Sequence, residues 1–324
     1  EPNIVCDVLN INNINFYKTG IDHGTITAVI DEYKFEITSL REDVSTDGRH
    51  ANVKFSKSWK KDASRRDFTI NSIYSDVKGN LFDPYNGKDD LKKGFVNFIG
   101  DPDKRIKEDY LRILRYLRFF LSYSKKSHDK DLIRKLKLNL NGVSKLSKDR
   151  LLDELKKLIK AENLEKLSKD KICLELISLI FPELKNINIF SKLNSLKRQI
   201  VENSDFIFLI SLMVIDDTDN SDYFLYKFNI SKKDEKRIKK ISNFYKEKGG
   251  FKKFNEKDIN EIFYYDGKQA VLDILNFKII KSKKIDNSLI KLSKTYINKI
   301  KPIIPIRASE LMEKYKIPEG KQLG

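Results

Sequence analysis

The sequence predicts an α+β protein in which a small mixed α/β region precedes a remainder made only of helices. Two observations carry this prediction. Near the N-terminus, β-branched and aromatic residues alternate with polar ones, which is the period of a half-buried strand. Beyond residue 98, apolar residues recur at helical spacing instead. With 324 residues the chain is long enough for more than one core, and its 40% hydrophobic content is ordinary for a folded protein.

The mixed region is predicted to begin with an antiparallel hairpin. Residues 23–40, HGTITAVIDEYKFEITSL, alternate around a short DE break, with Glu36 on the opposite face from Phe35 and Ile37. The stretch RRDFTINSIY, residues 65–74, suits a short helix. A small hairpin around DVKGN, the turn DPYNG, a short helix KDDLKK and a strand FVNFI are expected to follow.

The helical remainder is predicted to begin at GDPDKRIKEDYLRILRYLRFFLSYS. Asp101 is placed to cap a helix there, Pro102 suits its first turn, and apolar residues recur from Ile106 to Phe120. Farther on, LSKDRLLDELKKLIKAENLEKL opens with a serine cap. DEKRIKKISNFYKEK and DNSLIKLSKTYINKI are amphipathic, with lysine on their outer faces.

The charge of the chain points to a polyanionic partner. The formal net charge is +17, and the sequence pI is about 9.5. Such a surplus is the electrostatic footprint of a protein that meets polyphosphate, although a plainly solvated lysine surface is the alternative when charge is considered alone.

Composition also excludes several classes of protein. The two cysteines, Cys6 and Cys173, lie far apart, and the three histidines show no ligand spacing, so we expect neither a disulfide framework nor a zinc site. The longest apolar run, from Phe206 to Ile215, is too short to span a membrane, and the N-terminus lacks a signal-peptide pattern. A cytoplasmic chain is expected.

Arginine is concentrated in one part of the sequence. Of 13 arginines, eight fall between residues 41 and 118, whereas basic charge elsewhere is mostly lysine. A guanidinium offers a rigid fork of donors for phosphate, carboxylate or a base edge, whereas lysine is a mobile point charge. The concentration predicts that this part of the chain needs the fork.

Five segments resemble, in order and spacing, the motifs of class II tRNA nucleotidyltransferases, which include CCA-adding enzymes and bacterial poly(A) polymerases. They are TGIDHGTITAVID, RRDFTINSIY, DPYNGKDDL, GDPDKRIKEDYLRILRYLRF and LSKDRLLDELKKL. The resemblance is close up to about residue 165, and beyond it the chain is similar only in being helical and basic. It implies a partial polymerase-β-like nucleotidyltransferase head at residues 1–98, a helical nucleotide-selecting neck at 99–165, and a helical, tRNA-binding body and tail at 166–324.

The family pattern RRDxxxN matches Arg65, Arg66, Asp67 and Asn71. The resemblance implies that these residues recognise the ribose and triphosphate of the incoming nucleotide. A guanidinium suits phosphate, and a carboxylate and an amide suit hydroxyl groups. The alternative for Asp67 is a plain ion pair with a neighbouring arginine, and Phe68 is expected in the core.

The family pattern EDxxR assigns base selection to Asp109 and Arg112. Their i, i+3 spacing puts both on one helical face, where they can form an ion pair or a base-reading edge. A carboxylate can accept from cytosine N4 or adenine N6, whereas uracil and guanine present carbonyl oxygens there. Arg115 is assigned to nucleotide phosphate, and Arg118 to structure or phosphate.

Two further matches have a structural alternative. DPYNG, with Asp83 and Gly87, resembles the flexible-loop motif that helps rotate the selected nucleotide, and a plain proline-containing turn is the alternative. Arg150 and Glu154 match the last family motif, and their i, i+4 spacing suggests an ion pair that supports the neck.

The resemblance also implies Mg²⁺, held by carboxylates. The family supplies two aspartates from a DxD that follows a GGxxR segment. That segment is expected immediately upstream of Glu1, so the metal ligands are unknown. Glu36 is the candidate for the third catalytic carboxylate, because it projects from a strand next to where the DxD strand would pair. The alternative is a solvent-facing hairpin residue.

Two other DxD patterns are rejected as substitutes because neither follows a Gly-rich strand turn. They are Asp101 with Asp103 and Asp217 with Asp219. The missing segment, together with the abrupt C-terminal end at IPEGKQLG, predicts a fragment cut at both ends, which would be inactive by itself, and a split or degenerate enzyme is the alternative.

The predicted activity is the addition of C, C and A to the 3′ end of tRNA from CTP and ATP with Mg²⁺. A poly(A) polymerase or an A-adding enzyme with the same motifs is the closest alternative. A catalytically inactive RNA-binding protein is another, whereas a purely structural helical protein leaves the motifs unexplained. The expected partners are tRNA, ATP and CTP, and the sequence does not predict the oligomeric state.

Overall fold

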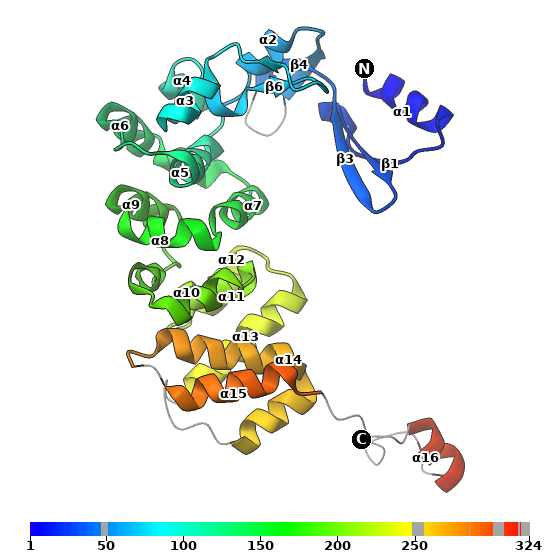
Figure 1. Cartoon of the computed structure of the whole chain (residues 1–324), viewed down its shortest axis with the longest axis vertical. Coiled ribbons are helices and arrows are strands. Elements are labelled where there is room, and N and C mark those ends of the chain that lie inside the picture. The colour runs from blue at the N-terminus through cyan, green and yellow to red at the C-terminus, as the bar shows by residue number, and fades with distance from the viewer. Residues whose placement is uncertain (47–50, 248–255, 285, 301–307, 317, 319–324) are drawn as a thin grey trace. The chain divides into compact units, whose positions relative to one another are not determined.

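The computed structural model describes residues 1–46, 51–247, 256–284, 286–300, 308–316 and 318. The chain divides into two compact units, Glu1–Pro182 and Glu183–Gly324. The described strands all lie in the first unit, and helices make up most of both (Figure 1). The predicted α+β class is therefore confirmed. The boundaries proposed after residues 98 and 165 both fall inside the first unit and remain predictions.

The first unit opens with a helix packed on a three-stranded antiparallel sheet of order β1-β2-β3. The elements are α1 (Pro2–Ile11), β1 (Asn15–Gly20), the 3₁₀ turn Ile21–His23, β2 (Thr25–Ile30) and β3 (Tyr33–Thr38). Cys6 and Leu9 of α1 pack against Ile26 and Ala28 of β2, and all four are buried. The predicted hairpin is correct, because β2 and β3 pair antiparallel and Asp31 turns between them with φ 54°.

The next segment is built from short elements. They are the antiparallel pair β4 (Arg41–Thr46) and β5 (Ala51–Phe55), α2 (Trp59–Ser64), the 3₁₀ turn Thr69–Asn71, the antiparallel pair β6 (Tyr74–Ser75) and β7 (Leu81–Phe82), and α3 (Gly87–Lys93). The small hairpin around DVKGN and the KDDLKK helix are thus correctly predicted.

Two predicted elements of this segment are wrong. RRDFTINSIY does not form the predicted helix, because α2 ends at Ser64, just before it, and only the 3₁₀ turn Thr69–Asn71 lies within it. Asn71 accepts a hydrogen bond from the Phe68 amide at 3.2 Å, and such local side-chain bonds compete with helical ones. FVNFI forms no strand. It is joined to the motif by one isolated β-bridge, between Phe68 and Phe98, and beside this bridge Thr69 N donates a hydrogen bond to Asn97 O at 3.0 Å.

The rest of the first unit is helical. Its helices are α4 (Pro102–Glu108), α5 (Leu111–Tyr123), α6 (Lys130–Leu138), α7 (Lys148–Leu158), α8 (Ala161–Lys169) and α9 (Lys171–Ile180), with a 3₁₀ turn at Leu140–Lys145. The predicted caps are correct, since Asp101 accepts from Lys104 N at 2.9 Å and Ser147 from Arg150 N at 3.4 Å. Phe68 is fully buried, as expected, and its ring centroid lies 4.6 Å from that of Phe98.

The second unit is helical throughout its described residues. It contains the 3₁₀ turn Ile187–Lys192, α10 (Ser195–Glu202), α11 (Phe206–Val214), α12 (Asn220–Lys227), α13 (Lys232–Glu247), α14 (Glu256–Lys281), α15 (Asn287–Asn298) and α16 (Ala308–Tyr315). Ile259, Phe263 and Leu275 of α14 form a core with Leu289 and Tyr296 of α15. Within the described ranges, no helix has both the length and the apolar character needed to cross a bilayer.

A glycine interrupts the long helix of the second unit. Gly267 in α14 has φ 85° and ψ −179°, a backbone conformation that is accessible almost only to glycine. The helix therefore consists of two arms that meet at this residue.

Candidate functional site

The tandem arginines of RRDFTIN are held by one buried carboxylate, that of Asp62. Asp62 is 1% exposed and lies on α2, one helical turn before Arg65 and Arg66. Its Oδ1 accepts from Nε and Nη2 of Arg65 at 2.9 and 2.7 Å. Burial alone would raise the pKa of Asp62, but hydrogen bonds from Tyr74 and Arg65 hold this pKa below its ordinary value of 3.8. Asp62 is therefore an anion that fixes the arginine pair.

Arg66 is the more exposed of the two arginines. Its side chain is 39% exposed, against 17% for that of Arg65. Arg66 donates to the Tyr74 hydroxyl and to the Asn71 carbonyl, both at 3.2 Å, and to Asp62 at 3.4 Å. The Tyr74 hydroxyl donates to Asp62 at 2.7 Å, and burial together with this bond raises the pKa of Tyr74 to about 12. Since a guanidinium has five N–H groups, Arg66 keeps donors for an anion.

Asp67 links the motif to α5. Its carboxylate is 5% exposed and accepts from Nε and Nη2 of Arg115, the latter at 3.1 Å, and from the Asn71 side-chain amide. Burial alone would raise the pKa of Asp67, but the hydrogen bonds and charge of Arg115 keep this pKa below 3.8. The ion-pair alternative for Asp67 is therefore present in the structure. Recognition of ribose by Asp67 and Asn71 remains a prediction, and it would require these side chains to exchange partners.

Arg105 of α4 holds the backbone of the arginine pair. Its Nη2 donates to the carbonyl oxygens of Arg65 and Arg66 at 2.7 and 2.6 Å, and its Nη1 donates to Glu108 at 2.6 Å. Arg112 of α5 donates to the same Glu108 carboxylate at 2.7 Å. These bonds connect α4 and α5 to the segment that carries the motif.

Asp109 and Arg112 do not share a helical face, so that prediction is wrong. Asp109 has extended backbone angles, φ −154° and ψ 106°, and separates α4 from α5. Its Oδ1 accepts from Leu111 N, two residues on, at 3.1 Å, and such a local side-chain bond competes with continuing the first helix. Its Oδ2 accepts from Nη2 of Arg150 on α7 at 2.8 Å. Base selection by Asp109 and Arg112 remains a prediction.

Glu154 of the last motif pairs with Arg118, whereas the predicted partner was Arg150. Glu154 is 1% exposed and accepts from Nε of Arg118 at 2.5 Å. Its other oxygen lies 4.0 Å from Nη1 of Arg115. Arg118 also lies over the ring of Phe119, with 4.3 Å between its guanidinium carbon and the ring centroid. Arg118 and Glu154 thus pack α5 against α7.

These charged groups form three sets of ion pairs, which we together call the arginine network; Arg105 links two of them through the backbone carbonyls of Arg65 and Arg66, and Asn71 links Arg66 to Asp67. It comprises Asp62, Arg65, Arg66, Asp67, Arg105, Glu108, Arg112, Arg115, Arg118 and Glu154. Its arginines outnumber its carboxylates, so at neutral pH it carries a positive surplus. Arg66 and Arg115, with 39% and 26% of their side chains exposed, present part of that surplus to solvent. A surplus of oriented guanidinium groups is suited to binding phosphate.

The DPYNG segment is held tightly beside the network. Asp83 accepts from the amides of Gly87 and Lys88, both at 2.8 Å, and so caps α3. A Cβ built on Gly87 would lie 2.0 Å from the carbonyl oxygen of Thr69. Only glycine allows α3 to approach the Thr69–Asn71 turn this closely. A moving role for Asp83 and Gly87 remains a prediction.

Glu36 projects from β3 opposite Thr27 of β2 and is exposed. Mg²⁺ prefers several oxygen ligands, usually carboxylates and waters. Within the described residues, one group of three or more His, Cys, Asp or Glu side chains is close enough to share an ion, and it does not include Glu36. The catalytic role of Glu36 therefore remains a prediction.

The first unit matches a known family. Residues 1–97 match the family model described as "Poly A polymerase head domain". Over 142 residues the chain is 50% identical to human "CCA tRNA nucleotidyltransferase 1, mitochondrial", which covers 43% of this chain and 33% of that protein. The resemblance to this enzyme family is confirmed. The chain spans about a third of the length of the first curated relatives it matches, at 33% to 34%.

A longer match extends through both units. The chain is 28% identical over 312 residues to the "CCA-adding enzyme" of Streptococcus uberis, covering 94% of this chain and 75% of that protein. The crystal structure of the Bacillus stearothermophilus CCA-adding enzyme in complex with CTP aligns with a TM-score of 0.63 at 19% identity, covering 95% of this chain and 76% of that one. A complex structure of a CCA-adding enzyme with ATP aligns with a TM-score of 0.57 at 18% identity, covering 96% and 74%. The predicted fold, a head followed by helices, is therefore confirmed.

Sequence reasoning did not identify three residues of the arginine network. Asp62 lies three and four positions before the tandem arginines, and this helical spacing could have indicated it. Glu108 is the first residue of EDxxR and Arg105 lies three residues before it, but apolar spacing marks both only as helical. The contact of Arg105 with two carbonyl oxygens has no sequence signal, because it depends on an approach across about 40 residues of chain.

Proposed function

We propose that this protein adds nucleotides to the 3′ end of tRNA, placing C, C and A from CTP and ATP. The observation that carries the proposal is that the RRDxxxN and EDxxR segments come together in one arginine network, in a chain similar to CCA-adding enzymes. The relatives include CCA-adding enzymes, and two of the aligned structures are CCA-adding enzymes in complex with CTP and with ATP.

Within this proposal, the arginine network binds the triphosphate. Arg66 and Arg115 carry the exposed guanidinium edges, and Asp62 and Asp67 hold these edges in place. Because the forks are fixed before the nucleotide arrives, less side-chain entropy is lost when phosphate binds. Asp109 and Arg112 would then face the base, where a carboxylate favours the amino groups of C and A over the carbonyl oxygens of U and G.

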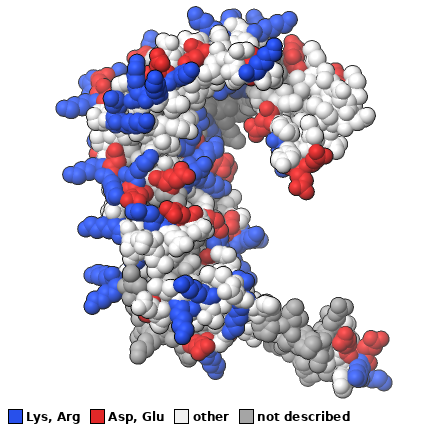
Figure 2. All heavy atoms as spheres, viewed as in Figure 1, with Lys and Arg blue, Asp and Glu red and all other residues white. Residues whose placement is uncertain are grey.

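The helices of the second unit are proposed to hold the RNA. A hollow of about 1210 Å³ on α14 and α15 is lined by more basic than acidic groups. The lysines that line it are Lys278, Lys281, Lys283, Lys284 and Lys291, and its acidic groups are Glu256 and Asp286. Figure 2 shows lysine and arginine side chains projecting from many elements of the chain, interspersed with acidic ones. Such a surface contacts phosphates and helix shape without reading sequence.

The family model's own description favours a second candidate, polyadenylation, because it names a poly(A) polymerase head. An inactive RNA-binding protein is the third, because neither DxD pattern of this sequence follows a Gly-rich strand turn. The use of Mg²⁺ is part of our proposal. A cytoplasmic location is also proposed, although the human relative is a mitochondrial enzyme.

One assay separates these candidates. The chain, alone and restored with the GGxxR and DxD segment expected upstream of Glu1, is incubated with tRNA lacking its 3′ CCA and with labelled CTP, ATP, UTP or GTP, with and without Mg²⁺, and the products are sequenced. Ordered C, C and A added to tRNA by the restored chain supports the proposal. A-only tails on any RNA support polyadenylation, and no incorporation by a restored chain that binds tRNA supports the inactive alternative.

The base-selecting role is tested with Asp109→Ala. In the chain restored upstream of Glu1, we expect this variant to incorporate UTP and GTP relative to CTP and ATP on the order of tenfold more often than the restored wild type. Asp153→Ala, which removes an exposed carboxylate of α7, is the matched control and should keep wild-type selectivity. Unchanged selectivity in Asp109→Ala would leave Asp109 a structural partner of Arg150.

A further inference from the structure

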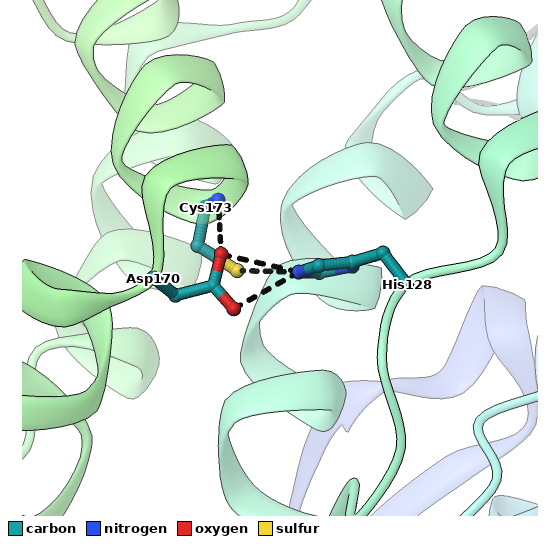
Figure 3. A group of neighbouring side chains, drawn as sticks. All are labelled: His128, Asp170 and Cys173. Atoms are coloured by element: carbon teal, nitrogen blue, oxygen red, sulfur yellow. Dashed lines mark hydrogen bonds and ion pairs between the residues drawn. The ribbon is translucent and has the colours of Figure 1, made fainter.

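Three side chains that play no part in the family motifs meet in the first unit. His128 lies between α5 and α6, Asp170 is the N-cap of α9, and Cys173 lies in the first turn of α9 (Figure 3). His128 is 42 residues from Asp170 and 45 from Cys173, so no short ligand motif marks them in the sequence. The expectation that the histidines and cysteines would form no metal cluster followed from that long spacing.

The donor atoms of the three side chains lie close enough together to share one metal ion. His128 Nε2 lies 3.1 and 3.2 Å from the two carboxylate oxygens of Asp170 and 3.7 Å from Sγ of Cys173. All three donors lie within 4.8 Å of one another. With Zn–N, Zn–O and Zn–S bonds of about 2.0, 2.0 and 2.3 Å, neighbouring donors of a tetrahedral site lie about 3.3 to 3.6 Å apart.

The surroundings orient the histidine for such a role. The Tyr116 hydroxyl lies 3.1 Å from Nδ1 of His128, which leaves Nε2 directed at Asp170 and Cys173. The Phe120 ring stacks on the imidazole with 3.7 Å between centroids and an interplanar angle of 15°. A ligating histidine usually makes a hydrogen bond with its other ring nitrogen, and that bond fixes its orientation.

Charge and access also fit a soft divalent cation. A thiolate and a carboxylate together neutralise a dication, and imidazole and thiolate donors select zinc over magnesium or calcium. The side chain of His128 is 6% exposed, whereas that of Asp170 is 27% exposed and gives the ion a path from solvent. Three protein ligands leave the fourth corner to water.

We propose that His128, Asp170 and Cys173 bind one Zn²⁺ ion, which ties the connection between α5 and α6 to the start of α9. A metal-free alternative exists, in which Asp170 and Tyr116 simply hydrogen-bond the two ring nitrogens. The two differ in whether the sulfur binds a metal, and this difference can be measured directly. The site is independent of the proposed transferase activity, so its test does not depend on that activity.

The test uses Co²⁺ as a spectroscopic probe for the zinc site. The full chain is stripped with a chelator and titrated with Co²⁺ while the near-ultraviolet and visible absorption is recorded. We expect one equivalent to bind, with a thiolate-to-cobalt charge-transfer band and tetrahedral d–d bands, and Zn²⁺ to displace both. Cys173→Ser should lose the charge-transfer band, and Cys6→Ser, which removes the other buried cysteine, should keep it.

A milder variant guards against misfolding of Cys173→Ser. Tyr116→Phe removes only the hydroxyl beside Nδ1, and we expect it to weaken Co²⁺ binding by about 10-fold to 100-fold while the far-ultraviolet circular dichroism stays that of the wild type. Folded wild-type protein without a thiolate-to-cobalt band would overturn the proposal in favour of the hydrogen-bonded alternative. A band that survives in folded Cys173→Ser, or full affinity in Tyr116→Phe, would overturn it as well.

Discussion

Asp62 and Asp67 are carboxylates that solvent hardly reaches, yet both are held in the ionised form by arginines. An isolated buried carboxylate would take up a proton, because desolvation disfavours the charge. The fork of Arg65 at Asp62 and that of Arg115 at Asp67 reverse this preference. Each fork is therefore oriented by its carboxylate, and each carboxylate is stabilised by its fork.

Asp67→Asn is expected to remove stability that depends on pH. The pKa of Asp67 is lower in the folded chain than its ordinary value, so its contribution is present above about pH 4 and is lost as the pH falls through the lowered pKa. We expect the variant to lose about 2 kcal/mol at pH 7, the scale of a hydrogen bond to a charged group, and progressively less as the pH falls below about 4.

Urea unfolding of both proteins at several pH values between 7 and 3 measures this difference. Asp153→Asn is the control, because the exposed ion pair of Asp153 with Lys156 contributes little to the free energy of unfolding. A difference between Asp67→Asn and wild type that stays constant over this range would contradict the expectation.

For single residues, the sequence predicted most of the charged residues of the arginine network but not all of their partners. The motif positions of Arg65, Arg66 and Asp67 predicted where the guanidinium groups gather. Arg115, the partner of Asp67, lies 48 residues away on α5, and the sequence around neither residue indicates such a pair. The same reason explains why Glu154 was assigned to Arg150, its neighbour on α7, whereas it binds Arg118.

Among the elements, a close backbone approach fixes the position of one helix, and a local side-chain bond ends another. Gly87 lies against the carbonyl of Thr69, and Asp109 interrupts what apolar periodicity predicted as one helix. Helices with a capping residue and amphipathic spacing, such as α7 and α15, were predicted from sequence. The break at Asp109 was not, because its cause is a side chain bonding to its own backbone two residues on.

Gly87→Ala is expected to destabilise the first unit by about 1 to 3 kcal/mol, the usual cost of overpacking. The new Cβ would lie 2.0 Å from a backbone oxygen, so either α3 or the turn that carries Asn71 must move. Thermal unfolding measures the loss. Gly20→Ala is the control, since its Cβ would meet its nearest atom at an ordinary 3.5 Å. Equal melting temperatures for Gly87→Ala and Gly20→Ala would show that α3 adjusts freely.

For the whole molecule, the surplus of lysine predicts binding that depends on salt. Each phosphate that a lysine neutralises releases counterions, so affinity falls as salt is added. For about five phosphate contacts, the tRNA dissociation constant should rise on the order of 10²-fold to 10³-fold between about 50 and 200 mM salt. Fluorescence anisotropy with labelled tRNA across this range provides the measurement.

The same titration tests the lysine-lined hollow of the second unit. Replacing Lys283 and Lys284 together by alanine should lower the slope of log affinity against log salt by about two. Lys169→Ala, which removes a lysine paired with Glu165, should leave the slope unchanged. If the double variant keeps the wild-type slope, the tRNA binds elsewhere.

The division into a sheet-containing unit and a helical unit follows from features visible in the sequence. Alternation near the N-terminus and helical spacing afterwards are local patterns, and they carried the fold class. The boundary between the units after Pro182 is not a local pattern, because it depends on which helices contact one another. The meeting of His128 with Cys173 was missed for that reason too.

Arg150 competes with a nucleotide base for the Asp109 carboxylate, because its bond to Asp109 is formed before the nucleotide arrives. If Asp109 selects the base, the base edge must take over an oxygen that accepts from Arg150 at 2.8 Å. The amino group of C or A can replace that donor, whereas the carbonyl oxygen of U or G cannot. Arg150→Ala would remove the competitor, so we expect CTP to bind more tightly but the ratio of CTP to UTP affinity to fall severalfold. Equilibrium dialysis with both nucleotides measures that ratio, and an unchanged value would mean that Arg150 only packs α7. On this view, Arg150 touches no nucleotide, yet its bond to Asp109 sets the interaction free energy that a base edge must exceed in order to bind.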